Sequence, residues 1–226
     1  MKNPFRALTR FEWTLWLSSA AVITLSFILS GGGDWLSMTA SLIGVTALIF
    51  VAKGYVLGQV LTVVFAVFYG IVSYCFRYYG EMITYLGMTA PSAVATAIAW
   101  MKHPYKDSSE VEIRRITLRQ IKNLALITAG ATVLFYFVLR ALGNASLIVS
   151  TLSIATSVAA SCLTFMRSPY YALAYAANDL VLIVLWSVAA AQDITCIPML
   201  MCFIMFFLND LYGFFNWRRM MKRQSA

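Results

Sequence analysis

Long apolar stretches, separated by short polar segments, form most of the chain. A helix that crosses the hydrocarbon of a bilayer needs about 20 predominantly apolar residues. Charged residues, glycines and prolines mark the ends of the stretches. The pattern predicts eight membrane-spanning helices, over residues 13–30, 36–51, 55–76, 82–100, 123–139, 145–166, 170–190 and 196–215. We therefore expect an all-α integral membrane protein.

The one long hydrophilic stretch runs from residue 101 to 122. Within it, Ser109 is followed three residues later by Glu112, a spacing typical of a capping box at a helix start. The pattern predicts a charged helix over residues 110–122, lying along the membrane or leading into it.

The helices on either side of this stretch form two similar groups of three, and the first helix of each group ends at a single cation, Lys53 or Arg167. The third helix ends on a tryptophan, Trp100 or Trp217, followed by cations. Three is an odd number, so a linking helix over 123–139 is needed to give both groups the same orientation. We predict an N-terminal tail and first helix (1–35), repeat 1 (36–100), a loop and linker helix (101–144), repeat 2 (145–217) and a basic tail (218–226). Parallel repeats are typical of transporters with a substrate site at mid-membrane.

Composition supports the membrane assignment. The 226 residues are 61% hydrophobic and 12% charged, with a mean hydropathy of +0.78. A soluble globular domain carries about twice that share of charge. Composition therefore excludes a soluble domain.

The net charge of +8 follows the predicted topology. With the N-terminus inside, all of the 17 Lys and Arg residues except Arg77 and Arg140 fall on the inner side, as the positive-inside rule requires. We predict a multi-pass protein of the cell inner (plasma) membrane with both termini in the cytoplasm. No nucleic-acid partner is expected, because no soluble segment carries a basic stripe with interleaved aromatics.

The first apolar stretch follows Lys2, Arg6 and Arg10, so a cleaved signal peptide is the alternative to a retained helix. The segment 29–31 is a poor cleavage site, which favours retention.

Acidic residues inside the apolar stretches are the main candidates for function. An ionisable group at the centre of a bilayer costs at least about 2.5 kcal/mol, so it faces a bundle interior or a wet cavity. Seven of the nine acidic residues are predicted to lie at or between the ends of the stretches: Glu12, Asp34, Glu81, Asp107, Glu110, Glu112 and Asp193. Asp179 and Asp210 remain inside them.

Helical spacing gathers further polar and aromatic groups near these two acids. Tyr175, Asn178, Asp179 and Trp186 share a broad face of the seventh span. Asn209, Tyr212 and Asn216 share a stripe of the eighth span, next to the stripe of Asp210. Such a set suits a cationic or polar heteroaromatic ligand.

Other intramembrane polar groups have an alternative role in helix packing. Gln59 in the third span is a candidate site residue. The sixth span carries a hydroxyl row at Ser153, Thr156, Ser157 and Ser161, which is more typical of packing between helices in lipid. Pro91 and Ser92 predict an irregularity in the fourth span. Tryptophans near the span ends, such as Trp100 and Trp217, favour an interfacial belt.

Signatures of catalysis, metals and cofactors are absent from the sequence. The one histidine, His103, falls in the hydrophilic stretch, and no nucleophile elbow, metal-protease motif or phosphate-binding loop is present. The four cysteines have no C-x-x-C spacing. We expect no enzyme, metal site or cofactor.

Two segments of repeat 2 resemble the PnuC family of vitamin transporters: YYALAYAANDLVLIVLW (170–186) and FLNDLYGFFNWRR (207–219). VAKGYV (51–56) and YYGE (78–81) add to the resemblance, which covers nearly the whole chain. It implies a SWEET-like bundle of three, one and three helices. It also implies import of nicotinamide riboside for NAD biosynthesis by facilitated diffusion, trapping by cytoplasmic phosphorylation, and a homotrimer.

The resemblance also implies site residues. Tyr175 and Asp179 match an aromatic residue and a polar residue four positions later, where many relatives have Trp and Asn. Gln59 matches a polar position of the third span. Because Tyr175 and Asp179 stand where many relatives have Trp and Asn, thiamine and riboflavin remain open as substrates. A proton-coupled carrier using Asp179 or Asp210 and, in a different class, a membrane-embedded enzyme are the remaining alternatives.

Overall fold

The computed structural model describes residues 4–32, 35–106, 108–144 and 146–225. Ala145, Asp34 and Asp107 lie outside these ranges. Over the described residues the elements are η1 (Pro4–Ala7), α1 (Arg10–Leu29), α2 (Trp35–Ala52), α3 (Val56–Cys75), α4 (Tyr79–Ile83), η2 (Thr84–Thr89), α5 (Ala90–Lys102), α6 (Leu118–Ala141), α7 (Leu147–Phe165), α8 (Tyr171–Gln192), η3 (Ile194–Cys196) and α9 (Ile197–Gln224).

Within these ranges, eight helical segments are long and apolar enough to cross a membrane. They coincide with the eight predicted spans, so the prediction of an all-α membrane protein is confirmed. The fourth segment is built from α4, η2 and α5, and the eighth from η3 and α9. Helix α9 continues through residues 218–224, where the sequence predicts a tail.

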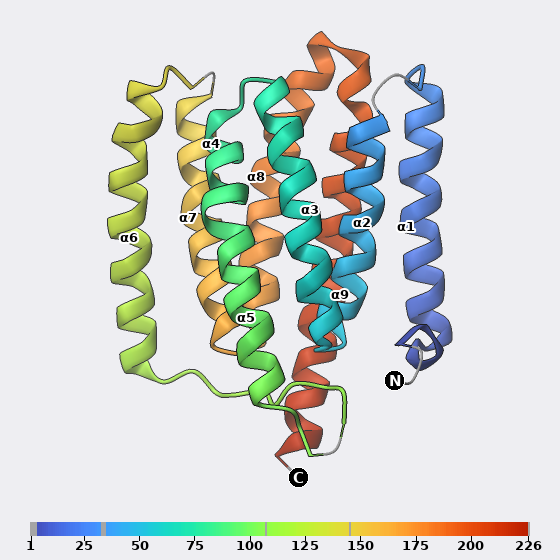
Figure 1. Cartoon of the computed structure of the whole chain (residues 1–226), viewed down its shortest axis with the longest axis vertical. Coiled ribbons are helices and arrows are strands. Elements are labelled where there is room, and N and C mark those ends of the chain that lie inside the picture. The colour runs from blue at the N-terminus through green and yellow to red at the C-terminus, as the bar shows by residue number, and fades with distance from the viewer. Residues whose placement is uncertain (1–3, 33–34, 107, 145, 226) are drawn as a thin grey trace.

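Six of the segments form a closed ring. Helix α2 packs on α3, α3 on α5, and α4 and α5 on α7; α8 then packs on both α7 and α9, and α9 returns to α2. Each predicted repeat supplies three members of the ring. Helix α1 flanks α2 and α9, and α6 flanks α7, so these two stand at opposite edges of the bundle (Figure 1).

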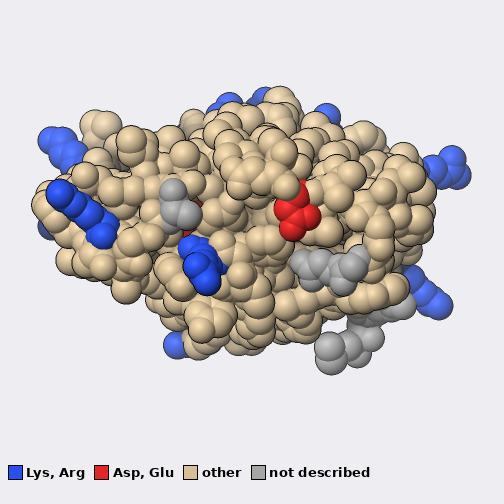
Figure 2. Space-filling model, turned by 90° about the horizontal axis from the view of Figure 1, so that it is seen from above, with Lys and Arg blue, Asp and Glu red and all other residues tan. Residues whose placement is uncertain are grey.

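Both termini lie at one end of the bundle, which we call the terminal end (Figure 1). The loops after α2, α5 and α7 also lie there, and these loops together with the adjoining ends of α1, α5, α6 and α9 carry most of the lysines and arginines. Figure 2 looks onto the other end, whose face consists largely of uncharged residues. The separation of charge that the sequence predicts is therefore present along the bundle axis.

The segment from Ser108 to Thr117, which we call the strap, crosses the terminal end as extended chain. Its backbone binds both repeats: Val111 N donates to Gly54 O and Arg114 N donates to Arg167 O, each at 3.0 Å. The predicted helix over residues 110–122 is therefore wrong in its first half. The capping box lies instead at Thr117 and Gln120, where α6 begins. Backbone pairing with the loops of both repeats explains why 110–117 stays extended.

A buried ion pair joins α1 to the ring. Glu12, which the sequence placed at the end of an apolar stretch, is 1% exposed. Its carboxylate accepts hydrogen bonds from Lys53 Nζ at 3.0 Å and from the Tyr212 hydroxyl at 2.8 Å. The position of Glu12 along the sequence did not predict this burial, which results from packing of α1 against α2 and α9.

Replacing Lys53 with methionine is expected to lower the free energy of unfolding by about 1–2 kcal/mol, because a buried carboxylate loses its cation. The thermal unfolding midpoint in detergent measures the effect. Lys102→Met is the control, since Lys102 is exposed and forms no ion pair with a described residue. Equal midpoints for the two variants would contradict this assignment.

Candidate functional site

A cavity of about 50 Å³ lies inside the ring, between the two repeats. Repeat 1 contributes Gly44, Ala47, Leu48, Val51, Gln59, Thr62, Phe65, Tyr85 and Thr89, and repeat 2 contributes Tyr175, Asn178, Asp179, Phe206 and Asp210. The structure thus brings five predicted site residues together: Gln59, Tyr175, Asn178, Asp179 and Asp210. No lysine, arginine or histidine is among the described residues that line this cavity.

The two predicted acids meet in this cavity. The side chains of Asp179 and Asp210 hydrogen-bond to each other, and both are nearly fully buried, at 3% and 4% exposure. An ionised carboxylate can only accept hydrogen bonds, so this contact requires at least one proton on the pair. Asp179 Oδ2 has no hydrogen-bond partner among the described residues. The pair therefore carries at most one negative charge, and Asp179 Oδ2 is an acceptor without a donor among the described residues.

The neighbouring amide is held by the hydroxyl row of α7. Asn178 Oδ1 lies within hydrogen-bonding distance of the hydroxyls of Ser153 (3.2 Å), Thr156 (2.9 Å) and Ser157 (3.0 Å). These hydroxyls were expected to serve helix packing, and they also fix an amide of the cavity wall. Because the oxygen of Asn178 faces α7, its Nδ2 group is directed away from α7 and is a hydrogen-bond donor for a ligand.

A third acid belongs to the same network, and the linear pattern missed it. Glu81, in α4, is fully buried, and its Oε2 accepts from the Ser153 hydroxyl at 3.1 Å. Its Oε1 has no partner among the described residues. Ser153 therefore contacts both Glu81 and Asn178, and links the acid to the cavity wall.

Close packing of α4 on α7 explains this burial. Gly80 packs so closely on α7 that an added Cβ would lie 2.8 Å from Ser150 Cβ, and the Asn144 side chain accepts from Gly80 N at 3.1 Å. The π-helical segment η2 follows one turn later and carries Tyr85, which lines the cavity. Such segments frequently occur at functional sites. The irregularity expected near Pro91 thus lies immediately before it.

Tryptophans close the cavity toward the terminal end. Trp100 Nε1 of repeat 1 donates to Thr164 O of repeat 2 at 3.3 Å, and Trp217 Nε1 of repeat 2 donates to Val51 O of repeat 1 at 3.0 Å. The two rings lie 5.5 Å apart and are almost completely buried. Placing them in an interfacial belt is therefore wrong, because each indole N–H binds the opposite repeat.

A second aromatic layer closes the cavity on the other side. Trp186 Nε1 donates to the Tyr69 hydroxyl at 2.9 Å, and the Tyr69 ring lies 4.3 Å from Tyr85 and 5.4 Å from Phe203. Trp186, which we expected to stack on a ligand, belongs to this layer and not to the described cavity wall. The cavity thus lies between two aromatic layers.

Three other predicted site residues also lie away from the cavity wall. Asn209 donates to the Ser19 hydroxyl of α1 at 3.1 Å, and Tyr212 binds the buried carboxylate of the same helix. Asn216 donates to Ala52 O at 2.8 Å, at the terminal end of α2. In this conformation, all three connect α9 to neighbouring helices.

Comparisons with known proteins agree with this architecture. A family model described as "Nicotinamide mononucleotide transporter" matches residues 34–219. The chain belongs to this family. Its members are membrane transporters, so the prediction of a transporter of the PnuC type, and not an enzyme, is confirmed.

Relatives extend the match to both ends of the chain. The chain is 26% identical to a nicotinamide riboside transporter PnuC of Neisseria mucosa, over 98% of this chain and 86% of that protein. It is also 26% identical to the protein of that name from Haemophilus influenzae, over 93% and 91%. The crystal structure of a vitamin B3 transporter PnuC superposes with a TM-score of 0.85 at 26% identity, covering 96% of this chain and 94% of that one.

Proposed function

We propose that this protein imports nicotinamide riboside by facilitated diffusion, alternately opening the cavity to the two sides of the membrane. The names of its relatives support this substrate. The lysines and arginines gathered at the terminal end support an orientation in the inner (plasma) membrane with this end facing the cytoplasm. Assembly into a homotrimer is a further part of the proposal and rests on the resemblance to the PnuC family.

The observation that carries the proposal is the pair of hydrogen-bonded acids in a cavity without a cation. Nicotinamide riboside has one positive charge, on its pyridinium ring, which a pair holding one proton neutralises. The mononucleotide adds a phosphate, whose negative charges would lie in a buried site without Lys or Arg to pair with them. The cavity therefore favours the riboside over the mononucleotide.

Each residue of the wall suits one part of this ligand. Tyr175 offers an aromatic face to the pyridinium ring. Asp179 Oδ2 and Gln59 can bind ribose hydroxyls or the carboxamide, and the Asn178 amide donates to an oxygen acceptor. For Tyr175, Asp179 and Gln59, these roles follow from the family positions that the resemblance matches to them.

Substrate entry requires movement of the wall. Pockets for small molecules usually measure about 300–1,000 Å³, far more than the cavity of about 50 Å³. Phe206 and Tyr85 line the cavity, and both contact Phe65, so their rings are the bulky groups to displace. With aromatic layers on both sides, this conformation suits the occluded step of an alternating-access cycle.

Binding and uptake test the proposal directly. Nicotinamide riboside is expected to raise the thermal midpoint of the detergent-purified protein, and labelled riboside should enter proteoliposomes saturably. Nicotinamide mononucleotide, thiamine and riboflavin are the comparison ligands. If only thiamine or riboflavin raises the thermal midpoint, that vitamin is the substrate and the riboside is not. If only the mononucleotide raises it, the charge argument is contradicted.

The shared proton of the two acids favours one further candidate, a proton-coupled carrier. If a cation displaces this proton, uptake should respond to an imposed pH gradient at equal substrate concentrations on both sides. Simple facilitated diffusion gives no net uptake under that condition. The same proteoliposomes distinguish the two mechanisms.

Glu81→Ala is expected to weaken riboside binding about tenfold, because Ser153 loses a partner and the Asn178 amide becomes less ordered. Glu81→Gln should retain most of the affinity, since its amide can still bond to Ser153. Thr84→Ala is the matched control, because among the described residues its hydroxyl donates to Gly80 O of the same segment and to no other group. Titration of riboside by calorimetry measures all three. If Glu81→Ala and Thr84→Ala bind the riboside with equal affinity, Glu81 has no role in the site.

A further inference from the structure

Two adjoining hollows separate the linker helix α6 from the ring. The first, of about 710 Å³, lies at the terminal end and is lined by Arg115, Ile116, Ile121, Leu124, Leu163, Pro169, Tyr170, Arg218 and Met221. The second, of about 640 Å³, runs between α5, α6 and α7, and its wall includes Leu124, Ala131, Phe135, Val158 and Met166. Leu124 lines both, so the two hollows adjoin along α6, and we call them together the linker groove.

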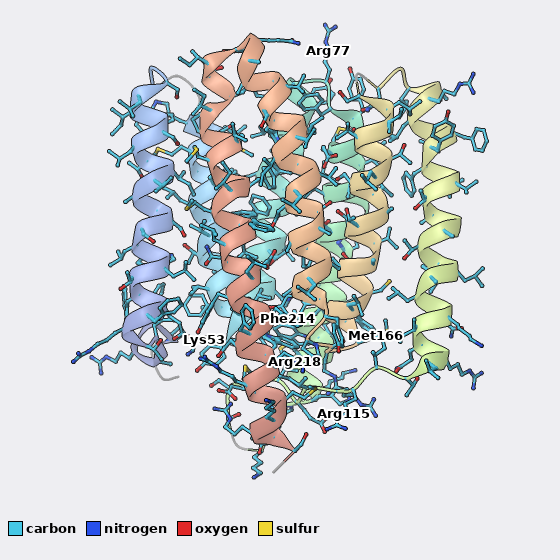
Figure 3. The ribbon with its side chains drawn as sticks, turned by 180° about the vertical axis from the view of Figure 1, so that it is seen from behind. Lys53, Arg77, Arg115, Met166, Phe214 and Arg218 are labelled. Atoms are coloured by element: carbon cyan, nitrogen blue, oxygen red, sulfur yellow. The ribbon has the colours of Figure 1, made fainter. Side chains whose placement is uncertain are left out.

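The linker groove has a basic mouth. Arg115 belongs to the strap and Arg218 to α9, and neither guanidinium group forms an ion pair with an acid among the described residues. The contacts of Arg218 are the Tyr170 hydroxyl at 3.4 Å and the face of the Phe214 ring at 5.9 Å. Figure 3 shows Arg115, Met166, Phe214 and Arg218 near the terminal end. Two unpaired guanidinium groups from different segments thus line one hollow.

The second hollow is largely apolar, although Ser92, Gln120, Asn123 and Ser161 also line it. Val158, Phe135 and Ala131 line its deep part, and the other faces of α6 expose large apolar side chains such as Leu126 and Phe137. Among the ring helices, α6 packs chiefly on α7. A helix that packs chiefly on one neighbour leaves space along its other sides for another apolar chain.

We propose that the linker groove is a binding site for an anionic phospholipid. Its phosphate would bind Arg115 and Arg218 at the mouth, and one acyl chain would fill the apolar hollow between α5, α6 and α7. Guanidinium groups bind phosphate oxygens in a bidentate manner, and basic pockets between transmembrane helices bind anionic head groups. The lipid would thereby join the strap and α6 to α7 and α9.

Charge complementarity selects this occupant. A zwitterionic lipid adds a cation beside two arginines, and a soluble phosphate leaves the apolar hollow unfilled. Each arginine is worth about 1 kcal/mol toward an anionic surface, so two correspond to about a 30-fold preference over a zwitterionic lipid with the same chains. This inference does not depend on which substrate the protein carries.

Native mass spectrometry of the detergent-purified protein, with equimolar phosphatidylglycerol and phosphatidylcholine of identical chains, measures the preference. We expect about 30-fold retention of phosphatidylglycerol, falling to near equality in the Arg115→Gln, Arg218→Gln double variant. Arg140→Gln, at the other end of α6, is the matched control and should retain the preference. Equal retention of both lipids by the unaltered protein, or an unchanged preference in the double variant, would overturn the proposal.

A second variant tests the apolar part of the groove with the arginines unchanged. Ala131→Phe is expected to reduce retention of phosphatidylglycerol at least about fivefold, because the larger ring occupies the place of the acyl chain. Glycerophosphoglycerol, the head group without chains, is the second probe. If it binds as well as the whole lipid, or if Ala131→Phe retains lipid fully, the groove has no part in binding and the proposal fails.

Discussion

Replacement of Asp179 with alanine is expected to reduce nicotinamide riboside uptake at least about 100-fold. The variant removes the unpartnered carboxylate oxygen of the cavity and the charge that would neutralise the pyridinium ring. Loss of a hydrogen bond to a charged group in a buried site costs about 3 kcal/mol, which corresponds to that factor. Initial uptake rates in proteoliposomes, normalised to inserted protein, measure it.

Two further variants separate charge from structure. Asp179→Asn keeps the shape and can still bond to Asp210, so the protein should fold normally and still lose most of its uptake. Asp193→Ala removes an exposed acid outside the spans; hydrogen bonds from Thr195 hold the pKa of Asp193 below its usual value, so it is fully ionised at neutral pH. Uptake by Asp193→Ala should match the unaltered protein. Normal uptake by both Asp179 variants would exclude this residue from the site.

Gly58→Ala is expected to lower the free energy of unfolding by about 3 kcal/mol. Helices α2 and α3 approach so closely there that an added Cβ would lie 2.4 Å from Val51 N and 2.8 Å from the Phe50 carbonyl carbon. Both atoms belong to the backbone, so no side-chain rotation relieves the overlap and the helices must separate. The thermal midpoint in detergent should fall markedly.

Gly130→Ala is the matched control for this prediction. Gly130 also lies inside a helix, α6, but nothing lies within 4 Å of its added Cβ. Alanine is the better helix former, so this variant should be neutral or slightly more stable. Similar midpoints for the two variants would mean that α2 and α3 can separate at no cost.

The spans could be predicted because hydrocarbon imposes their length and composition. All eight predicted helices are present in the described residues; most ends are displaced by a few residues, and α9 continues nine residues beyond its predicted end at 215. The largest errors occur at the terminal end, where water is available and the hydrophobic pattern no longer constrains the chain. There the strap takes its conformation from loops distant in sequence, such as the one at Gly54.

Helical periodicity predicted the correct helix face for some site residues, but it did not show which of them lie at the level of the cavity along the helix axis. Trp186 is seven residues after Asp179, about 10 Å further along the axis, so both cannot contact one small ligand closely. Likewise, Asn209 and Asp210 are separated by about 100° around α9. The structure directs Asp210 to the cavity and Asn209 to α1. Only the positions of neighbouring helices decide such cases.

Glu81 was missed for a related reason. The preceding Tyr78, Tyr79 and Gly80 give its surroundings the character of a loop, and the glycine contact with α7 that buries it depends on tertiary structure. The extra residue in the π-helical turn that follows leaves no trace in the hydropathy pattern. A fully buried acid with an unsatisfied oxygen is recognised only from coordinates.

The crossed tryptophans at the terminal end have a consequence for the timing of transport. Each half of the molecule is fastened to the other by an equivalent indole–carbonyl bond, so neither half can swing away while the other bond persists. Passage toward that side should therefore be an all-or-none event, with few partly open intermediates. Single-molecule recordings would then show two discrete distances and abrupt switching.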